Sequence, residues 1–423
     1  MNQTKQSKTT LKFPKNFLWG ASISSHQVEG GNHNQWSVWE LETARTRASQ
    51  AEENYGSLPV WGDIKKQAMQ PSNYVSGAAS DHYARYEEDF ALAKKLNLTT
   101  LRSGIEWSRI EPNEGEFDPQ ALEHYRQYFD AMEAQGITPV LTLWHWTFPE
   151  WFADKGGFTK RRNVKYFTRY VDYVSKNIGR NFAYVITINE PTIYSVFSYQ
   201  QKRWPPEEKS LYLALRVLSR LKIAHKKSYK ILKKRWPRVQ IGLAHNCSYF
   251  YQGDDSIITR LTAWVLDLVG NRYAIHGVSK YQDFLGLNYY FANKVIGTRV
   301  HNPESPQNDL GWTMEPDKLR PMINHLYNQY KIPILVTESG VADMHDQYRQ
   351  WWISESIKAM SGAMADGSKM IGYIHWSLLD NFEWSEGFWP RFGLIEVDYT
   401  TQRRTIRDSA KWYGRFVAKM RNI

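Results

Sequence analysis

The sequence predicts an α/β protein built as a single-domain (β/α)8 barrel, the TIM-barrel fold. Three observations support this prediction: eight short apolar runs recur along the chain, segments with helical periodicity separate them, and no linker or shift in composition divides the chain. Near-continuous apolar strands alternating with amphipathic helices are typical of a parallel sheet covered by helices, and eight such units close a barrel. We expect residues 13–423 to form this domain and residues 1–12 to be disordered or loosely ordered.

The eight expected strands are short and almost uniformly apolar. They span residues 17–22, 98–103, 138–143, 184–189, 239–244, 284–288, 333–337 and 371–377. Between them, stretches such as 83–97 and 121–136 repeat apolar side chains at helical spacing and end at Asn97 and Gly136, residue types that terminate helices.

The segment after the first strand, residues 41–80, is polar and shows no convincing period. As the connection that leaves the carboxyl end of a strand, it is expected to lie over the mouth of the barrel. Its composition offers no anchor, so we favour a plain surface excursion over a functional lid.

The composition is that of a globular protein. Of 423 residues, 42% are apolar and 15% are aromatic, which excludes a disordered chain. The single cysteine, Cys247, rules out an intramolecular disulfide, and residues 1–12 lack the apolar stretch of a signal peptide, so we expect a cytoplasmic protein. No uninterrupted apolar run reaches the ~18 residues of a membrane span, so we expect no membrane partner.

The net charge of +11 raises the alternative of a nucleic-acid-binding protein, with residues 226–238 as its best local support. In that stretch the lysines surround an apolar stripe, as on the solvated face of an amphipathic helix, and no recognised nucleic-acid motif accompanies them. We therefore expect no nucleic-acid partner.

Polar and aromatic side chains follow almost every predicted strand. They are Arg102, His145, Trp146, Asn189, Glu190, Asn288, Tyr290, Glu338 and Trp376. Because the carboxyl ends of barrel strands form one rim, these residues are expected to converge on one mouth.

Two glutamates in this set, Glu190 and Glu338, each end a buried apolar run, where a carboxylate is costly to desolvate. Paired carboxylates ringed by aromatic residues are typical of glycosidic bond cleavage. Arg102 and Tyr290 would keep Glu338 ionised as the nucleophile, and the neighbouring charge would keep Glu190 protonated as the acid and later the base. This hypothesis requires carboxyl groups about 5–5.5 Å apart, the separation of retaining glycosidases.

A sugar also needs flat aromatic surfaces and fixed polar partners. Trp376, Trp384, Trp389 and Phe392 lie close in sequence to Glu383, while Gln27, His145 and Asn189 offer hydrogen bonds elsewhere on the rim. For any single tryptophan, core packing competes equally with sugar contact, because the chain has 18 of them.

These motifs resemble glycoside hydrolase family 1, the retaining β-glucosidases and β-galactosidases, from about Phe13 to Tyr413. The matching segments include FPKNFLWGAS, WSRIEP, TLWHWTFPEW, TINEP, DFLGLNYY, ILVTESG, WSLLDNFEW and GFWPRFGL. The resemblance implies that Glu190 is the acid/base and Glu338 the nucleophile, supported by Arg102, Asn288 and Tyr290. It implies substrate contacts from Gln27, His145, Asn189, Trp376, Glu383 and Trp384, and neither a metal nor a cofactor. From their places at the rim and in the aromatic cluster, we also expect Trp146 and Phe392 to contact the substrate.

Within that family, the carboxylate of Glu383 favours an unphosphorylated sugar, because it would repel a phosphate dianion. The expected partner is a small β-glycoside carrying glucose, with galactose, fucose and mannose left open. A noncatalytic carbohydrate-binding relative is the rival hypothesis, disfavoured because both glutamates are present. The sequence leaves open whether the chain is a monomer or a homo-oligomer.

Overall fold

The computed structural model describes residues 11–303 and 306–421. Residues 1–10 lie outside this range, so most of the expected loose N-terminus is not described. None of the described helices is long and apolar enough to cross a membrane.

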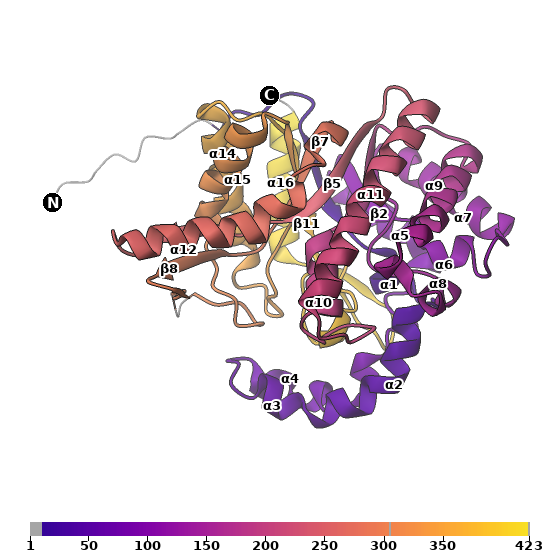
Figure 1. The fold of residues 1–423 in the computed structure, drawn as a ribbon, viewed down its shortest axis with the longest axis horizontal. Coiled ribbons are helices and arrows are strands. Elements are labelled where there is room, and N and C mark those ends of the chain that lie inside the picture. The colour runs from indigo at the N-terminus through magenta and orange to yellow at the C-terminus, as the bar shows by residue number, and fades with distance from the viewer. Residues whose placement is uncertain (1–10, 304–305, 422–423) are drawn as a thin grey trace.

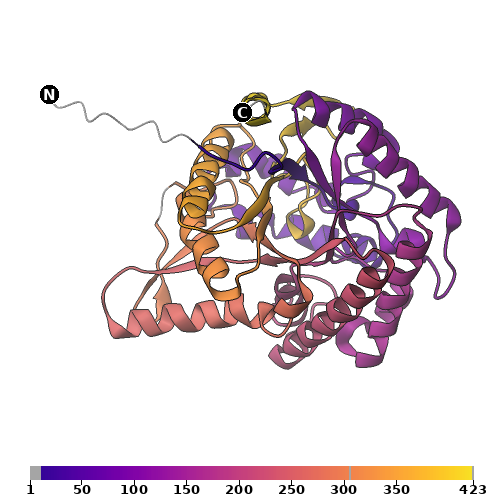
Figure 2. The same cartoon turned by 90° about the horizontal axis from the view of Figure 1, so that it is seen from above.

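Eight parallel strands close into a barrel, as predicted, and helices surround it (Figures 1 and 2). Around the barrel the order is β1, β2, β3, β4, β5, β7, β10, β11 and back to β1. Their bounds are Leu18–Ser22, Thr100–Gly104, Thr138–Thr142, Tyr184–Asn189, Gln240–Asn246, Phe284–Tyr289, Ile334–Ser339 and Met370–Trp376. Each predicted run therefore overlaps a barrel strand, and the ends of the run and the strand differ by no more than two residues.

The long helices around the barrel bury apolar stripes against it. They are α5 (His82–Lys95), α7 (Pro119–Ala134), α9 (Val164–Asn177), α11 (Leu211–Arg235), α14 (Leu319–Tyr330), α15 (Arg349–Ala365) and α16 (Asp408–Arg421). Helix α7 illustrates how the sequence specifies these helices. The Asp118 side chain accepts hydrogen bonds from backbone N–H groups of the first turn, and Pro119 begins the helix. The apolar side chains of Leu122, Tyr125 and Phe129 face inward.

The barrel interior is filled rather than hollow. A buried cluster takes one side chain from each of seven strands: Leu18, Val140, Ile186, Ala244, Phe284, Leu335 and Ile374. This layer forms a rigid apolar floor, so polar side chains can gather only beyond it, at the carboxyl ends of the strands.

Several excursions are built onto the barrel. After β1 come α1 (Ser25–Val28), α2 (Gln35–Ser49), α3 (Ala51–Tyr55), α4 (Trp61–Ala68) and η1 (Pro71–Tyr74), of which α2–α4 form an arm below the barrel in Figure 1. A separate three-stranded sheet contains β6 (Tyr249–Gln252), β8 (Ala292–Ile296) and β9 (Arg299–Val300), and α12 (Ile257–Asp267) packs on it.

The remaining short elements connect these parts. They are α6 (Trp107–Ile110), α8 (Glu150–Asp154), η2 (Gly157–Thr159), η3 (Arg161–Asn163), α10 (Pro191–Tyr199), η4 (Leu268–Arg272), α13 (Tyr273–Ile275), η5 (Ser279–Tyr281), η6 (Pro316–Lys318), η7 (Trp384–Glu386), β12 (Ile395–Val397) and β13 (Arg404–Ile406).

Candidate active site

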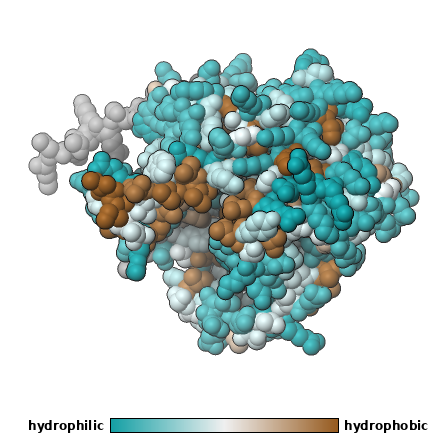
Figure 3. Space-filling model, viewed as in Figure 1, coloured by the Kyte–Doolittle hydropathy of each residue, from teal (hydrophilic) through white to brown (hydrophobic). Residues whose placement is uncertain are grey.

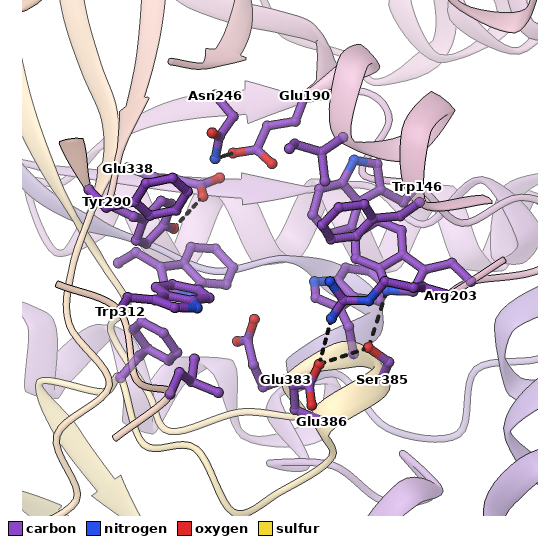
Figure 4. Close-up of a pocket in the computed structure, with 18 of the residues that line it drawn as sticks. Trp146, Glu190, Arg203, Asn246, Tyr290, Trp312, Glu338, Glu383, Ser385 and Glu386 are labelled. Atoms are coloured by element: carbon purple, nitrogen blue, oxygen red, sulfur yellow. Dashed lines mark hydrogen bonds and ion pairs between the residues drawn. The ribbon is translucent and has the colours of Figure 1, made fainter. Parts of the chain in front are cut away.

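A cavity of about 450 Å³ opens at the carboxyl ends of the barrel strands (Figure 4). Nine of the predicted site residues line it: His145, Trp146, Glu190, Tyr290, Glu338, Trp376, Glu383, Trp384 and Phe392. The other four, Gln27, Arg102, Asn189 and Asn288, are buried behind the wall, and each hydrogen-bonds to a residue that lines it. The structure therefore brings the whole predicted set together.

The strand that leads to each candidate carboxylate is irregular near its end, and this irregularity orients the side chain. The pairing of β4 with β5 shifts register between Ile186 and Asn189, and that of β10 with β7 shifts between Val336 and Glu338. Such irregularities re-aim side chains at the end of a strand. Glu190 itself adopts a left-handed backbone conformation, with φ of 41°, immediately before α10. In Figure 4 the two carboxyl groups point into the same part of the cavity.

Glycine is required two residues after Glu338. A Cβ atom at Gly340 would lie 1.9 Å from the carbonyl oxygen of Trp376, so any larger residue would push the ends of β10 and β11 apart. This close approach fixes Trp376 relative to the glutamate.

Glu338 is held by a cation and a phenol. The guanidinium of Arg102, on β2, donates to Oε1, and the Tyr290 hydroxyl donates to Oε2 at 2.7 Å. We expected Arg102 to keep this carboxyl ionised, and the contact is present. Burial nevertheless raises the pKa of Glu338 above its ordinary value, while Arg102 and Tyr290 act in the opposite direction.

Glu190 occupies a different environment. Its Oε1 accepts hydrogen bonds from the amides of Asn288, at 2.6 Å, and Asn246, at 3.1 Å, and it has no ion pair with a cation among the described residues. Burial, and then the charge of Glu338, raise the pKa of Glu190 to about 8. At neutral pH the carboxyl therefore carries a proton, as a general acid must.

A hydrogen-bonded network ties the two carboxyls together. Arg102 donates from Nη2 to Asn189 at 2.7 Å, and Asn288 donates to both Asn189 and Glu190 while accepting from Thr337. The Asn288 amide also helps to lower the pKa of Glu338 against the effect of burial. Asn288, expected only beside the nucleophile, thus serves both groups.

Glu383 forms a second polar centre on the opposite side of the cavity (Figure 4). The Gln27 amide lies 3.4 Å from its Oε2, and Gln27 is itself fixed by Ser24 and by the Phe382 carbonyl. Burial, and then the negative charges of Glu386, Glu338 and Glu190, raise the pKa of Glu383 to about 8. A neutral carboxyl here can both donate to and accept from a ligand hydroxyl.

The histidine at the mouth is an uncharged hydrogen-bonding group. His145 Nε2 lies 3.0 Å from the Asn189 amide, and burial together with Arg102 lowers the pKa of His145 well below its ordinary value. Its Nδ1 has no partner among the described residues, so it is available to a bound molecule.

The aromatic residues divide between the cavity and the core. Trp376, Trp384 and Phe392 line the cavity, whereas Trp389 is completely buried in a cluster with Ala51, Ile64 and Ala68. Trp389 therefore packs the fold, which was the competing interpretation for any single tryptophan.

The preference for a plain surface excursion at residues 41–80 was wrong. This segment is largely helical, and Asn54, Tyr55 and Leu58 line the cavity. The Tyr55 hydroxyl donates to Glu386 Oε2 at 2.5 Å, which anchors the arm to η7. The anchor comes from a partner more than three hundred residues away, so local composition gave no sign of it.

Sequence reasoning also missed part of the wall. Asn246 ends β5, a strand for which we named no mouth residue, although the polar pair His245–Asn246 directly follows the predicted run. Trp312, Arg203 and Glu386 lie in loops or at the end of a short turn, where no strand periodicity marks them.

Within the described part of the chain, no group of three or more His, Cys, Asp or Glu side chains is arranged to hold a metal ion.

Comparisons with known proteins show the family of this chain. The model of "Glycosyl hydrolase family 1" matches residues 9–264 and 264–422. "Beta-glucosidase A" of Thermotoga maritima is 28% identical and aligns with 96% of this chain and 98% of that protein. A "Bifunctional beta-D-glucosidase/beta-D-fucosidase" of Bifidobacterium breve is 26% identical, over 97% and 99%.

Solved structures show the same fold. A β-glycosidase from Pyrococcus horikoshii has a TM-score of 0.85 and 31% identity, covering 96% of this chain and 95% of that one. The β-glucosidase from Thermotoga maritima in complex with glucoimidazole has a TM-score of 0.84 and 27% identity, covering 97% and 99%. Because the family model spans nearly all of the described residues, the chain belongs to glycosyl hydrolase family 1.

Proposed function

We propose that this protein is a retaining β-glycosidase that removes terminal, nonreducing β-D-glucosyl residues from oligosaccharides or from aryl and alkyl glycosides. The observation that carries the proposal is the difference between two buried carboxyls in one cavity. Glu338 contacts the Arg102 guanidinium, whereas Glu190 has only amide partners and a pKa raised to about 8. Such a pair divides naturally into a nucleophile and a proton donor.

In the first half-reaction, an oxygen of ionised Glu338 attacks the anomeric carbon of the sugar. The bond from that carbon to the aglycone oxygen breaks, and the proton of Glu190 passes to the departing oxygen. Arg102 and Tyr290 hold the attacking carboxylate in place. The products of this step are a glycosyl ester on Glu338 and a free aglycone.

In the second half-reaction, Glu190 acts as a base. Esterification removes the negative charge of Glu338, which is one of the two causes that raise the pKa of Glu190, so Glu190 ionises more readily. It takes a proton from water as the water oxygen attacks the anomeric carbon, and the ester bond to Glu338 breaks. Two displacements at the same carbon restore the β configuration.

The inner end of the cavity suits an uncharged sugar. Hydrogen bonds can come from His145 and from Glu383, which Gln27 holds in place, and Trp376 and Trp384 supply flat apolar surfaces. A phosphate dianion would lie in the same space as the carboxylate of Glu338, and it would oppose any ionisation of Glu190 and Glu383, whose pKa values are raised to about 8. The printed names of the relatives, β-glucosidases and a bifunctional β-D-glucosidase/β-D-fucosidase, support glucose as the first choice of glycone.

A panel of p-nitrophenyl β-glycosides, carrying glucose, galactose, fucose and mannose, tests the substrate by the kcat/KM of each. We expect the glucoside to give the highest value, and highest activity on a 6-phosphoglucoside would overturn the assignment. Glu338→Gln should abolish turnover, and retention of more than about a thousandth of wild-type kcat would refute its role as nucleophile. Sugar binding without hydrolysis by the wild-type protein would favour the noncatalytic alternative.

A further inference from the structure

Helix α12 and the turn after it present an apolar face to solvent. Its large exposed side chains are Ile257, Ile258, Leu261, Trp264, Val265, Leu268, Val269 and Tyr273, which we call the α12 face. Their spacing of three or four residues places them on one side of the helix. Figure 3 shows brown, apolar side chains gathered on the side of the molecule where Figure 1 places α12.

The amphipathicity of α12 is inverted. The buried residues of α12 are Thr259, which accepts a hydrogen bond from the Gly297 backbone at 2.7 Å, and Ala263. In η4, the turn after it, the buried residue is Asn271, which bonds to Ser248. By contrast, Ile257 is 77% exposed and Trp264 is 52% exposed. A helix of a globular protein normally packs its apolar stripe inward, so a stripe of this size facing outward indicates an external apolar partner.

Cations accompany the aromatic residues of this face. The Arg272 guanidinium lies 5.5 Å from the Trp264 ring, and the Lys222 ammonium, from α11, lies 4.3 Å from the Tyr273 ring. Arg260 is exposed on α12 itself. The acidic groups nearby are Asp254 and Asp255, before the helix, and Asp267, which pairs with Arg272.

The charge of the whole region has the same sign. Residues 202–280 contain 16 lysines and arginines and five aspartates and glutamates, a surplus of 11, which equals the net charge of the entire chain. Three of these cations pair with acids outside the segment, Arg203 with Glu386, Lys233 with Asp283 and Arg235 with Asp172. The segment that carries the α12 face still has more cations than acids, and this excess favours an anionic partner.

We propose that the α12 face docks on an anionic lipid surface, with the helix lying in the plane of the interface. Leu261, Val265 and Val269 would enter the acyl boundary, Trp264 would sit at headgroup level, and Lys222 and Arg260 would meet lipid phosphates. A second copy of the chain is a poorer occupant, because it would bring an equally positive surface against this one. This proposal departs from the expectation of no membrane partner, which considered only runs that could span a bilayer. None of the described helices could cross the membrane, and α12 would lie on its surface.

Flotation of the purified full-length protein with lipid vesicles tests this proposal. We expect it to float with vesicles of phosphatidylcholine mixed with phosphatidylglycerol, and much less with phosphatidylcholine alone. Raising the ionic strength from about 0.1 M to about 1 M, which shortens the screening length from ~10 Å to ~3 Å, should weaken binding. Leu261→Gln should lower the partition coefficient by an order of magnitude or more, because it removes a leucine side chain from the apolar phase.

Leu41→Gln is the matched control, since Leu41 is 69% exposed on α2 and Leu261 is 59% exposed on α12. Both variants should keep wild-type turnover of an aryl glucoside, which shows that they are folded. Equal flotation of the two variants, or no flotation of the wild type, would overturn the proposal. A dimer in sedimentation velocity that Leu261→Gln dissociates, with no vesicle binding, would identify the face as a subunit interface instead.

Discussion

Replacement of Glu338 by glutamine should lower the pKa of Glu190. The substitution keeps the shape of the side chain and removes its negative charge, which is the second of the two causes that raise this pKa to about 8. The first cause, complete burial, is unchanged. The pKa should therefore fall but stay above 4.5, the ordinary value for a glutamate.

The size of the change follows from the proposed geometry. Two unit charges about 5.5 Å apart at an effective dielectric constant of about 20 interact by roughly 3 kcal/mol, equivalent to about two pKa units. Hydrogen bonds from Asn288 and Asn246 remain and favour the charged form. We expect a fall of between about one and two units.

Titration of side-chain carboxyls by carbon NMR measures this change. Protein labelled at the glutamate carboxyl carbon gives one signal per glutamate, and Glu190→Gln identifies the signal of Glu190 by its loss. In the wild type the two glutamates titrate as a coupled pair, so the comparison is made in the Glu338→Gln background, where one group remains. A pKa that stays at about 8 in this variant would show that the carboxyls are not electrostatic neighbours and would refute the reasoning.

Four further predictions follow from the same contacts. The kcat/KM of the wild type should fall as the pH rises through about 8, because Glu190 loses the proton that it must donate, and should fall in acid as Glu338 becomes protonated. Asn246→Ala should move the alkaline limb to higher pH, because the Asn246 amide stabilises the charged form of Glu190. Tyr290→Phe should lower kcat/KM by roughly tenfold to a hundredfold, the usual cost of losing a hydrogen bond to a charged group. Glu383→Gln should raise Tm, and by more at about pH 9 than at about pH 5. The folded protein keeps the proton of Glu383 up to a pKa of about 8, whereas the unfolded chain loses it near the ordinary value of 4.5, so ionisation increasingly favours the unfolded chain as the pH rises between these values.

Each of these has a contrary outcome. A flat profile between about pH 7 and about pH 9 would exclude Glu190 as the acid in the first step. An alkaline limb unmoved or moved to lower pH in Asn246→Ala, and wild-type kinetics in Tyr290→Phe, would each remove the corresponding contact from the account. A Tm gain for Glu383→Gln that is equal at both pH values would mean that Glu383 ionises alike in the folded and unfolded chains.

The sequence predicted the barrel because its strands are buried on both faces. A strand such as Tyr184–Asn189 must be apolar at nearly every position, so it stands out as a continuous run, and the polar residue that ends it marks the mouth. The same rule located Glu190 and Glu338, and it would have found Asn246 if the run at β5 had been followed to its last residue.

Features that depend on distant partners were not predictable in this way. The arm at α2–α4 lies against the mouth because Tyr55 reaches Glu386 and Trp389 fills the space behind it, and both partners lie far away in sequence. The environment of Glu338 likewise required the structure: Arg102 was expected to lower its pKa, but the depth of burial determines the net direction. Helix α12 has an amphipathic pattern, yet only the fold shows that the apolar side faces solvent.

The anomeric configuration of the first-formed sugar tests the central claim most directly. Proton NMR of the wild-type protein acting on p-nitrophenyl β-D-glucoside can follow the anomeric signals before the free sugar equilibrates. In the proposed mechanism Glu338 attacks the anomeric carbon first, and water then displaces Glu338 from the same carbon, so the β configuration is restored. We therefore expect β-glucose to appear first and the α form to follow only by mutarotation. Initial release of α-glucose would contradict the covalent mechanism and the roles assigned to Glu190 and Glu338.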